Sequence, residues 1–133
     1  MQGATTGGVR ILLRLEGLSL LLAATLAYSK LGLDWTTFGV FFLLPDLSFL
    51  GYFAGARIGA LSYNAAHSYL GAMSCLVIAY TTSSPILLSA GLIWLAHIGF
   101  DRALGYGLKY AEGFTYTHLG RIGRDKEEQR KTE

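Results

Sequence analysis

Four apolar stretches, separated by short turns, constrain this chain more than any other feature. They cover approximately residues 9–31, 35–53, 58–81 and 86–108. About 20 apolar residues in a helix cross the hydrocarbon core of a bilayer. Within lipid the backbone must pair its own polar groups, and a helix does so within one segment. We therefore predict an all-α membrane protein. Residues 1–110 would form a four-helix transmembrane bundle, and residues 111–133 a short surface-lying or flexible cytoplasmic tail.

The composition agrees with a membrane location. Of 133 residues, 52% are hydrophobic and only 15% are charged, whereas soluble domains carry about 25% charged residues. We expect the lipid bilayer to be the main partner, and the sequence contains no nucleic-acid-binding motif. Cys75 is the only cysteine and lies in an apolar stretch. It therefore cannot form an internal disulfide, and a packing role is expected.

The distribution of positive charge predicts the orientation of the chain. Ten of the eleven Lys and Arg residues fall near one side of the predicted bundle, and only Lys30 falls on the other. Positively charged residues concentrate on the cytoplasmic side of membrane proteins, so we expect both termini in the cytoplasm. The ten are Arg10, Arg14, Arg57, Arg102, Lys109, Arg121, Arg124, Lys126, Arg130 and Lys131.

The second apolar stretch contains a proline next to an acid, Pro45-Asp46. Proline lacks an N–H donor and its ring crowds the carbonyl four residues earlier, here that of Phe41, which predicts a kink. Backbone oxygens freed by the kink must find another partner within the membrane. Asp46 is therefore expected at a point where the helix is open.

Two later stretches carry polar residues at helical spacing. His97 and Asp101 are four residues apart and share one helical face, and Arg102 is turned by about 100°. Asn64 and His67 share a face in the third stretch, and Tyr63 reaches His67 at a spacing of four. An ionisable group at this depth costs roughly 2.5–3.5 kcal/mol on insertion scales and usually marks function.

These polar residues are predicted to lie at one depth. Counted from the cytoplasmic ends of an up-down bundle, four residues lie about seven residues inward, or roughly 10 Å. They are Glu16, Asp46, Asn64 and Asp101, and His67 and His97 lie about one turn deeper. The sequence therefore predicts one buried polar cluster near the cytoplasmic face.

The charges in this cluster favour a bound cation. Three carboxylates face two arginines, which leaves one negative charge for a proton, a cation or a substrate to compensate. Imidazole and carboxylate ligands without thiolates suit zinc, iron or manganese. The expected metal ligands are Asp46, His67, His97 and Asp101. The expected catalytic residues are Glu16 as a base, Asp101, and Arg102 as an anion clamp, and the further pocket residues are Arg14, Tyr63, Asn64, Tyr106 and His118.

Three functions remain open at this stage. A metal-assisted hydrolase of a membrane-soluble or amphipathic substrate is the working hypothesis, because metal-bound water is a strong nucleophile. A proton-coupled transporter or relay subunit would also use buried carboxylates and histidines. A structural polar network that fixes helix packing is the third alternative. Small residues in the second and third stretches are compatible with a homodimer.

Five sequence blocks resemble the bacterial membrane family described as domain of unknown function 4260, and together they cover most of the chain. The resemblance implies a small multi-span protein of the bacterial cytoplasmic membrane and no particular reaction. A looser similarity links Pro45-Asp46 and the helical histidines to small membrane-bound metal-dependent hydrolases, although the second histidine motif matches them poorly. The blocks are LRLEG (13–17), LPDLSFLGY (44–52), YNAAHSY (63–69), AHIGFDRALGYGLKY (96–110) and FTYTHLGRIG (114–123).

Overall fold

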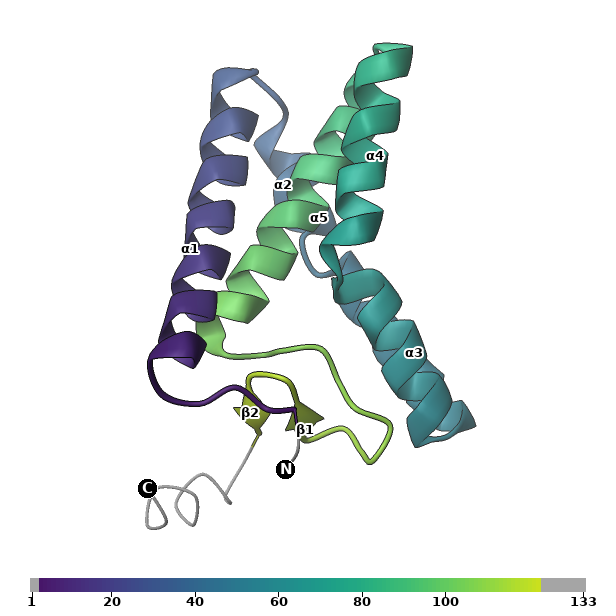
Figure 1. Ribbon diagram of the computed structural model, residues 1–133. Coiled ribbons are helices and arrows are strands. Elements are labelled where there is room, and N and C mark those ends of the chain that lie inside the picture. Colours follow the sequence, from purple (N-terminus) through teal and green to yellow (C-terminus); the bar gives the residue numbers. More distant parts are fainter. Residues whose placement is uncertain (1–2, 123–133) are drawn as a thin grey trace.

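Four helical segments follow one another along the chain, and two of them are broken (Figure 1). The computed structural model describes residues 3–122, so the predictions for the charged end of the tail fall outside the described residues. The elements are α1 (Gly7–Lys30), α2 (Trp35–Phe41), the 3-10 helix η1 (Leu44–Ala54), α3 (Ala56–His67), α4 (Tyr69–Thr82), α5 (Pro85–Leu104), β1 (Tyr116–Thr117) and β2 (Gly120–Arg121).

The second predicted helix breaks at the proline. α2 ends at Phe41, and η1 starts at Leu44 with Pro45 in its first turn. Proline is tolerated there because an N–H at that position has no partner within the helix. The break confirms the predicted interruption beside Asp46. The tight 3-10 geometry that follows for eleven residues was not predicted, since such helices are usually short.

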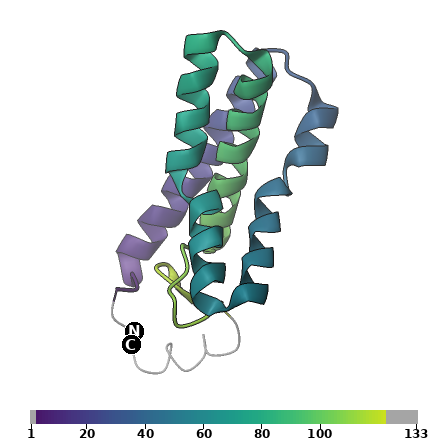
Figure 2. The same ribbon diagram turned by 90° about the vertical axis from the view of Figure 1, so that its right-hand side faces the viewer.

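The third predicted helix is also broken, and here the prediction of one continuous helix over residues 58–81 was wrong. Ser68 adopts an extended conformation (ψ 151°) between α3 and α4. α4 then continues from the end of α3 with a change of direction (Figures 1 and 2). No proline or glycine stands at this position, so the cause of the break must lie in tertiary contacts.

Three stretches of the described chain are long and apolar enough to cross a membrane. They are Gly7–Lys30, Trp35–Ala54 and Pro85–Leu104. The separate lengths of α3 and α4, 12 and 14 residues, are each too short for a full crossing. A fourth crossing would therefore need both helices in series.

Glycines allow the helices to approach closely. An added Cβ on Gly99 of α5 would lie 2.6 Å from the Gly17 carbonyl oxygen and 2.7 Å from the Leu21 nitrogen, both in α1. Gly91 of α5 packs in the same way against Leu76 of α4. Small residues at helix contacts are characteristic of membrane proteins, where packing replaces the hydrophobic effect as the force that joins helices. α5 thereby becomes the central helix, with α1 and α4 against it.

The main core lies where these three helices meet. Its buried members are Ala24 of α1, Ala72 of α4, and Leu95, Ala96 and Ile98 of α5. Leu92 and Ile93, farther toward the start of α5, pack with Tyr28 in a second cluster. These clusters pack α5 against α1 and α4, and this packing positions the polar residues that α5 carries.

The segment after α5 folds back beneath the helices. Gly105 ends α5 in a left-handed conformation (φ 92°) that favours glycine. The chain then returns to form the β1–β2 hairpin, and Lys109 pairs with Thr117 in an additional bridge. The backbone N–H of Thr5 donates to the His118 carbonyl oxygen over 2.8 Å, which fastens the hairpin to the start of α1.

Candidate metal centre

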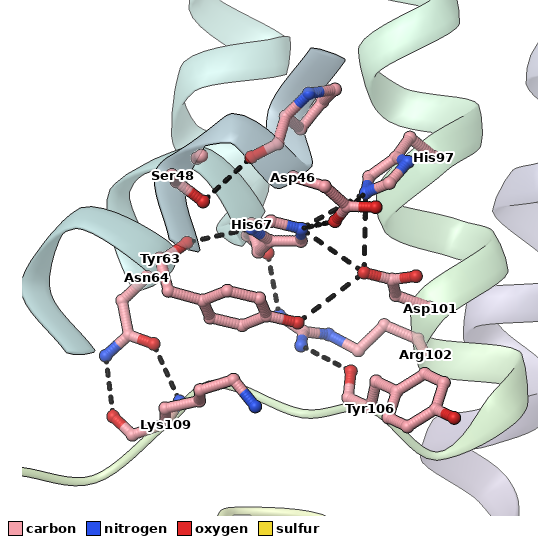
Figure 3. Close-up of polar contacts among 12 residues, drawn as sticks. Asp46, Ser48, Tyr63, Asn64, His67, His97, Asp101, Arg102, Tyr106 and Lys109 are labelled. Carbon is pink, nitrogen blue, oxygen red and sulfur yellow. Dashed lines mark hydrogen bonds and ion pairs between the residues drawn. The ribbon is translucent and has the colours of Figure 1, made fainter. Parts of the chain in front are cut away.

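Asp46, His67, His97 and Asp101 converge from three helical segments (Figure 3). η1 supplies Asp46, the last residue of α3 is His67, and α5 supplies the remaining two. One ligand atom of each residue lies within 4.8 Å of the other three. These four residues could therefore hold a metal ion, and they are the four that the spacing of polar residues predicted as ligands.

The distances between the ligand atoms are those of a small coordination site. His67 Nε2 lies 3.2 Å from Asp46 Oδ1, 3.2 Å from Asp101 Oδ2 and 3.1 Å from His97 Nε2. His97 Nε2 lies 3.2 Å from Asp46 Oδ1 and 3.4 Å from Asp101 Oδ2. These five separations are 3.1–3.4 Å, and the four ligand atoms all lie within 4.8 Å of one another, so one ion placed among them could contact all four.

The orientation of the His67 ring leaves a lone pair for a cation. His67 Nδ1 lies 2.9 Å from the Tyr63 carbonyl oxygen. Because a carbonyl only accepts, Nδ1 carries the proton, and in the neutral ring Nε2 then presents its lone pair to two carboxylates. Histidine ligands to metals typically donate their other N–H to a carbonyl in this way. With both rings neutral, the four residues carry a charge of −2, which a divalent cation balances.

Burial restricts access to one side of the centre. The side chains of His67 and His97 are each 1% exposed, that of Asp101 is 13% exposed, and that of Asp46 is 34% exposed. His97 Nδ1 is buried and makes no hydrogen bond to the described residues. A ligand or water would therefore enter beside Asp46.

The break between α3 and α4 positions His67, and side chains of α5 hold the break open. Trp94 Nε1 donates to the Ala66 carbonyl oxygen over 2.6 Å, and Arg102 Nη2 donates to the His67 carbonyl oxygen over 3.0 Å. The Trp94 indole also packs tightly against Gly71. These bonds satisfy carbonyls that the interrupted helix leaves without partners. The break was absent from the prediction because Trp94 and Ala66 are 28 residues apart.

Aromatic side chains complete the walls. The Tyr63 ring stacks on His67 with centroids 3.8 Å apart, and its hydroxyl lies 3.5 Å from Asp101 Oδ2. The edge of Phe42 meets His97 at 5.3 Å between centroids. Both imidazoles are therefore held by aromatic contacts that limit their rotation.

Comparison with known families shows to which family the chain belongs. A model of the family described as domain of unknown function (DUF4260) matches residues 10–122. The chain belongs to this family. No curated protein and no solved structure matches it. All four ligands of the candidate centre lie within the part of this DUF4260 chain that matches the family.

Five other predicted residues of this DUF4260 chain lie outside the ligand group. Glu16 is exposed on α1, and Tyr106 is half-exposed after α5. The other three bind backbone: Arg14 Nε donates to Ala103 over 2.9 Å, Asn64 pairs with both backbone groups of Lys109, and His118 Nδ1 accepts from Leu108. Roles for Glu16 as a base and for Arg102 as an anion clamp stay predictions. The observed bonds of Arg102 hold the backbone.

Lys109 is a buried residue that the sequence did not single out. It is only 4% exposed, its ammonium donates to the Phe114 carbonyl oxygen over 2.9 Å, and it lies 3.8 Å from the Phe114 ring centroid and 4.6 Å from that of Tyr63. Burial lowers the pKa of Lys109 from 10.5 to about 8, although the negative charge of Asp101 opposes the shift. A lysine after the last apolar stretch is more often a topology signal. Nothing local in the sequence therefore indicated that Lys109 would be buried between aromatic rings.

Proposed function

We propose that this protein is an integral membrane metallohydrolase that cleaves an ester in an amphipathic substrate. The observation that carries the proposal is the spacing of four ligand atoms around one point, with access beside Asp46. A structural zinc site normally closes with four protein ligands, whereas a catalytic site keeps a position for water or substrate. All four ligands here come from the protein, so the proposal requires water as a fifth ligand, which zinc can accept, and Asp46 is the ligand on the exposed side from which water would enter.

Zinc is the metal that this set of ligands favours. Two imidazoles and two carboxylates without a thiolate suit zinc, whereas calcium prefers oxygen ligands alone. Iron and manganese accept the same imidazole and carboxylate ligands but usually with more of them. We therefore expect zinc, and elemental analysis of the purified protein would identify iron or manganese if one of them is bound instead.

The chemistry requires a nucleophile and a proton carrier. A bound zinc ion lowers the pKa of a coordinated water to about 7. Asp46 Oδ2 makes no hydrogen bond to the described residues, and it stands at the exposed edge. It would accept a proton from the attacking water and return it to the leaving alcohol. The water oxygen bonds to the acyl carbon, the ester C–O bond breaks, and the products are one carboxylic acid and one alcohol.

The arrangement of positive charge supports the proposed orientation. The start of α1, the start of α3 and the end of α5 lie at the same end of the molecule (Figure 1). Arg10, Arg57 and Lys109 belong to this end, and Lys30 ends α1 at the other. The positive-inside rule then puts the hairpin and the metal centre nearer the cytoplasm of a bacterial cell. A reporter fused after Glu133 that is active only outside the cytoplasm would contradict this orientation.

Metal analysis with matched variants tests the proposal. Purified wild-type protein should contain about one metal ion per chain by elemental analysis, and it should hydrolyse short-chain acyl esters. Asp46→Asn and His97→Gln should lose both, because each removes one ligand with little change in volume. Asp34→Asn is the control, because Asp34 is an exposed carboxylate that caps α2 away from the centre.

The remaining candidates predict different outcomes. Wild-type protein without stoichiometric metal would contradict the metallohydrolase and favour a structural polar network. Metal without hydrolysis would contradict the catalytic part alone. A proton relay would show pH-driven flux in proteoliposomes that Asp46→Asn abolishes and that metal removal leaves unchanged.

A further inference from the structure

A large apolar groove lies beside the metal centre. It has a volume of about 630 Å³ between the α2–η1 segment and the first half of α5, within the range of about 300–1,000 Å³ typical of small-molecule sites. Phe41, Leu44, Ile86 and Ala90 are among its lining residues. Only Thr37 and Ser89 bring hydroxyl groups to it, so its wall is almost entirely hydrocarbon and aromatic.

The residues that line the groove are sequence neighbours of the metal ligands. Pro45 and Ala66 line the groove, and each directly precedes a metal ligand, Asp46 and His67. Ile93 and Trp94 also line it, and they lie one helical turn before His97 on the same side of α5. One end of a molecule in the groove would therefore lie next to the backbone that carries Asp46 and His67.

We propose that the groove binds the acyl chain of the substrate and that the protein acts on a single-chain lipid ester whose carbonyl reaches the metal centre. This inference rests on the proposed hydrolase function, to which it adds the substrate class. A peptide would leave backbone groups without partners against this wall, and a charged ligand would be desolvated without compensation. An alkyl chain has neither cost. Because the surrounding lipid is equally apolar, the groove selects by shape and orientation.

The two tryptophans of the chain provide a direct test. Trp94 lines the groove, whereas Trp35 is half-exposed at the start of α2 and does not line it. Trp35→Phe leaves Trp94 as the only indole, and Trp94→Phe leaves Trp35. Each variant would be reconstituted in unlabelled phosphatidylcholine vesicles with increasing mole fractions of dibromostearic acid, whose bromines quench indole fluorescence on contact. Quenching of Trp94 should saturate at a low mole fraction of the brominated acid. Quenching of Trp35 should instead rise in proportion to that mole fraction.

A substitution inside the groove should remove the saturation. Ala90→Phe, made in the Trp35→Phe background, fills part of the groove, and Ala23→Phe on the exposed face of α1 is the matched control. Trp94 quenching should become proportional only with Ala90→Phe, while both variants keep their metal content. In the hydrolysis assay, Ala90→Phe should lower turnover of esters with 12–16 carbons about tenfold relative to esters with 2–4 carbons.

These measurements separate the groove from the reaction. Proportional quenching of Trp94 in the Trp35→Phe protein, or saturation that survives Ala90→Phe, would overturn the acyl-chain site even if short esters are hydrolysed. Saturable quenching in a protein that contains metal but hydrolyses no ester would retain the acyl-chain site and overturn only the reaction.

Discussion

Arg102 offers the sharpest test of how the fold builds the centre. The residue is 6% exposed, and its guanidinium donates to the carbonyl oxygens of His67 over 3.0 Å and of Tyr106 over 3.4 Å. The His67 carbonyl belongs to the broken end of α3, so Arg102 fixes the backbone from which a metal ligand projects. Arg102→Gln should therefore weaken metal binding although Arg102 is not one of the four ligands.

The size of this effect follows from the lost hydrogen bond. A hydrogen bond from a charged donor contributes about 1.5–3 kcal/mol. Since about 1.4 kcal/mol corresponds to a tenfold change in an equilibrium constant, zinc affinity should fall about 10- to 100-fold if the bond acts by positioning His67. Loss of a residue that orients a metal ligand typically has an effect of this size.

Arg14→Gln is the matched control. Arg14 also donates to a helix carbonyl, that of Ala103, over 2.9 Å, but it is exposed and does not touch the break in the chain. Zinc affinity would be measured by competition with a chromophoric chelator, and circular dichroism would verify the helix content of each variant. Equal zinc affinity in Arg102→Gln and Arg14→Gln, with both folded, would refute the positioning role.

Three further predictions address packing, charge and the returning segment. Gly99→Ala should lower the free energy of unfolding by about 1–3 kcal/mol, because the added methyl group meets the α1 backbone. Gly39 lies in open space within α2, so Gly39→Ala should instead raise the free energy of unfolding by about 0.5–1 kcal/mol. Thermal melts would show whether the two changes have opposite signs. The pKa of Lys109 is lowered to about 8 in the folded protein, so between about pH 8 and 10.5 the unfolded chain binds more protons than the folded one. The melting temperature should therefore rise with pH across this window, and Lys109→Met should abolish that rise. Asn64→Leu removes both hydrogen bonds to the Lys109 backbone and should speed tryptic cleavage after Lys109, scored by mass spectrometry, while cleavage after the exposed Arg57 stays unchanged.

The helical architecture was largely readable from local sequence. Apolar stretches predicted where helices run, and Pro45 predicted the break beside Asp46, because proline acts on its own backbone. The break at Ser68 was not readable, since it depends on Trp94 and Arg102 from α5. The hairpin that returns to α1 was missed for the same reason: its contact with Thr5 spans 113 residues.

The candidate site was also predicted only in part from the sequence. Helical spacing and depth predicted that Asp46, His67, His97 and Asp101 would meet, because the rise per residue sets how far each residue lies from the end of its expected helix. Depth does not fix the direction in which a side chain points around the helix. Glu16, at the predicted level, therefore faces outward on α1, and Asn64 turns to the Lys109 backbone.

By itself, the sequence of this protein determined that helices would form, roughly where they would run, and which polar residues share a level, because backbone pairing and apolar length are local properties. Only the tertiary structure decided the 3.1–3.4 Å distances from the two imidazoles to their neighbouring ligand atoms, the burial of Lys109 and the apolar groove, whose lining includes the residues that precede Asp46 and His67. Those features depend on how α5 packs against segments distant in the chain, and that packing is set by side-chain shape rather than by hydrophobic pattern.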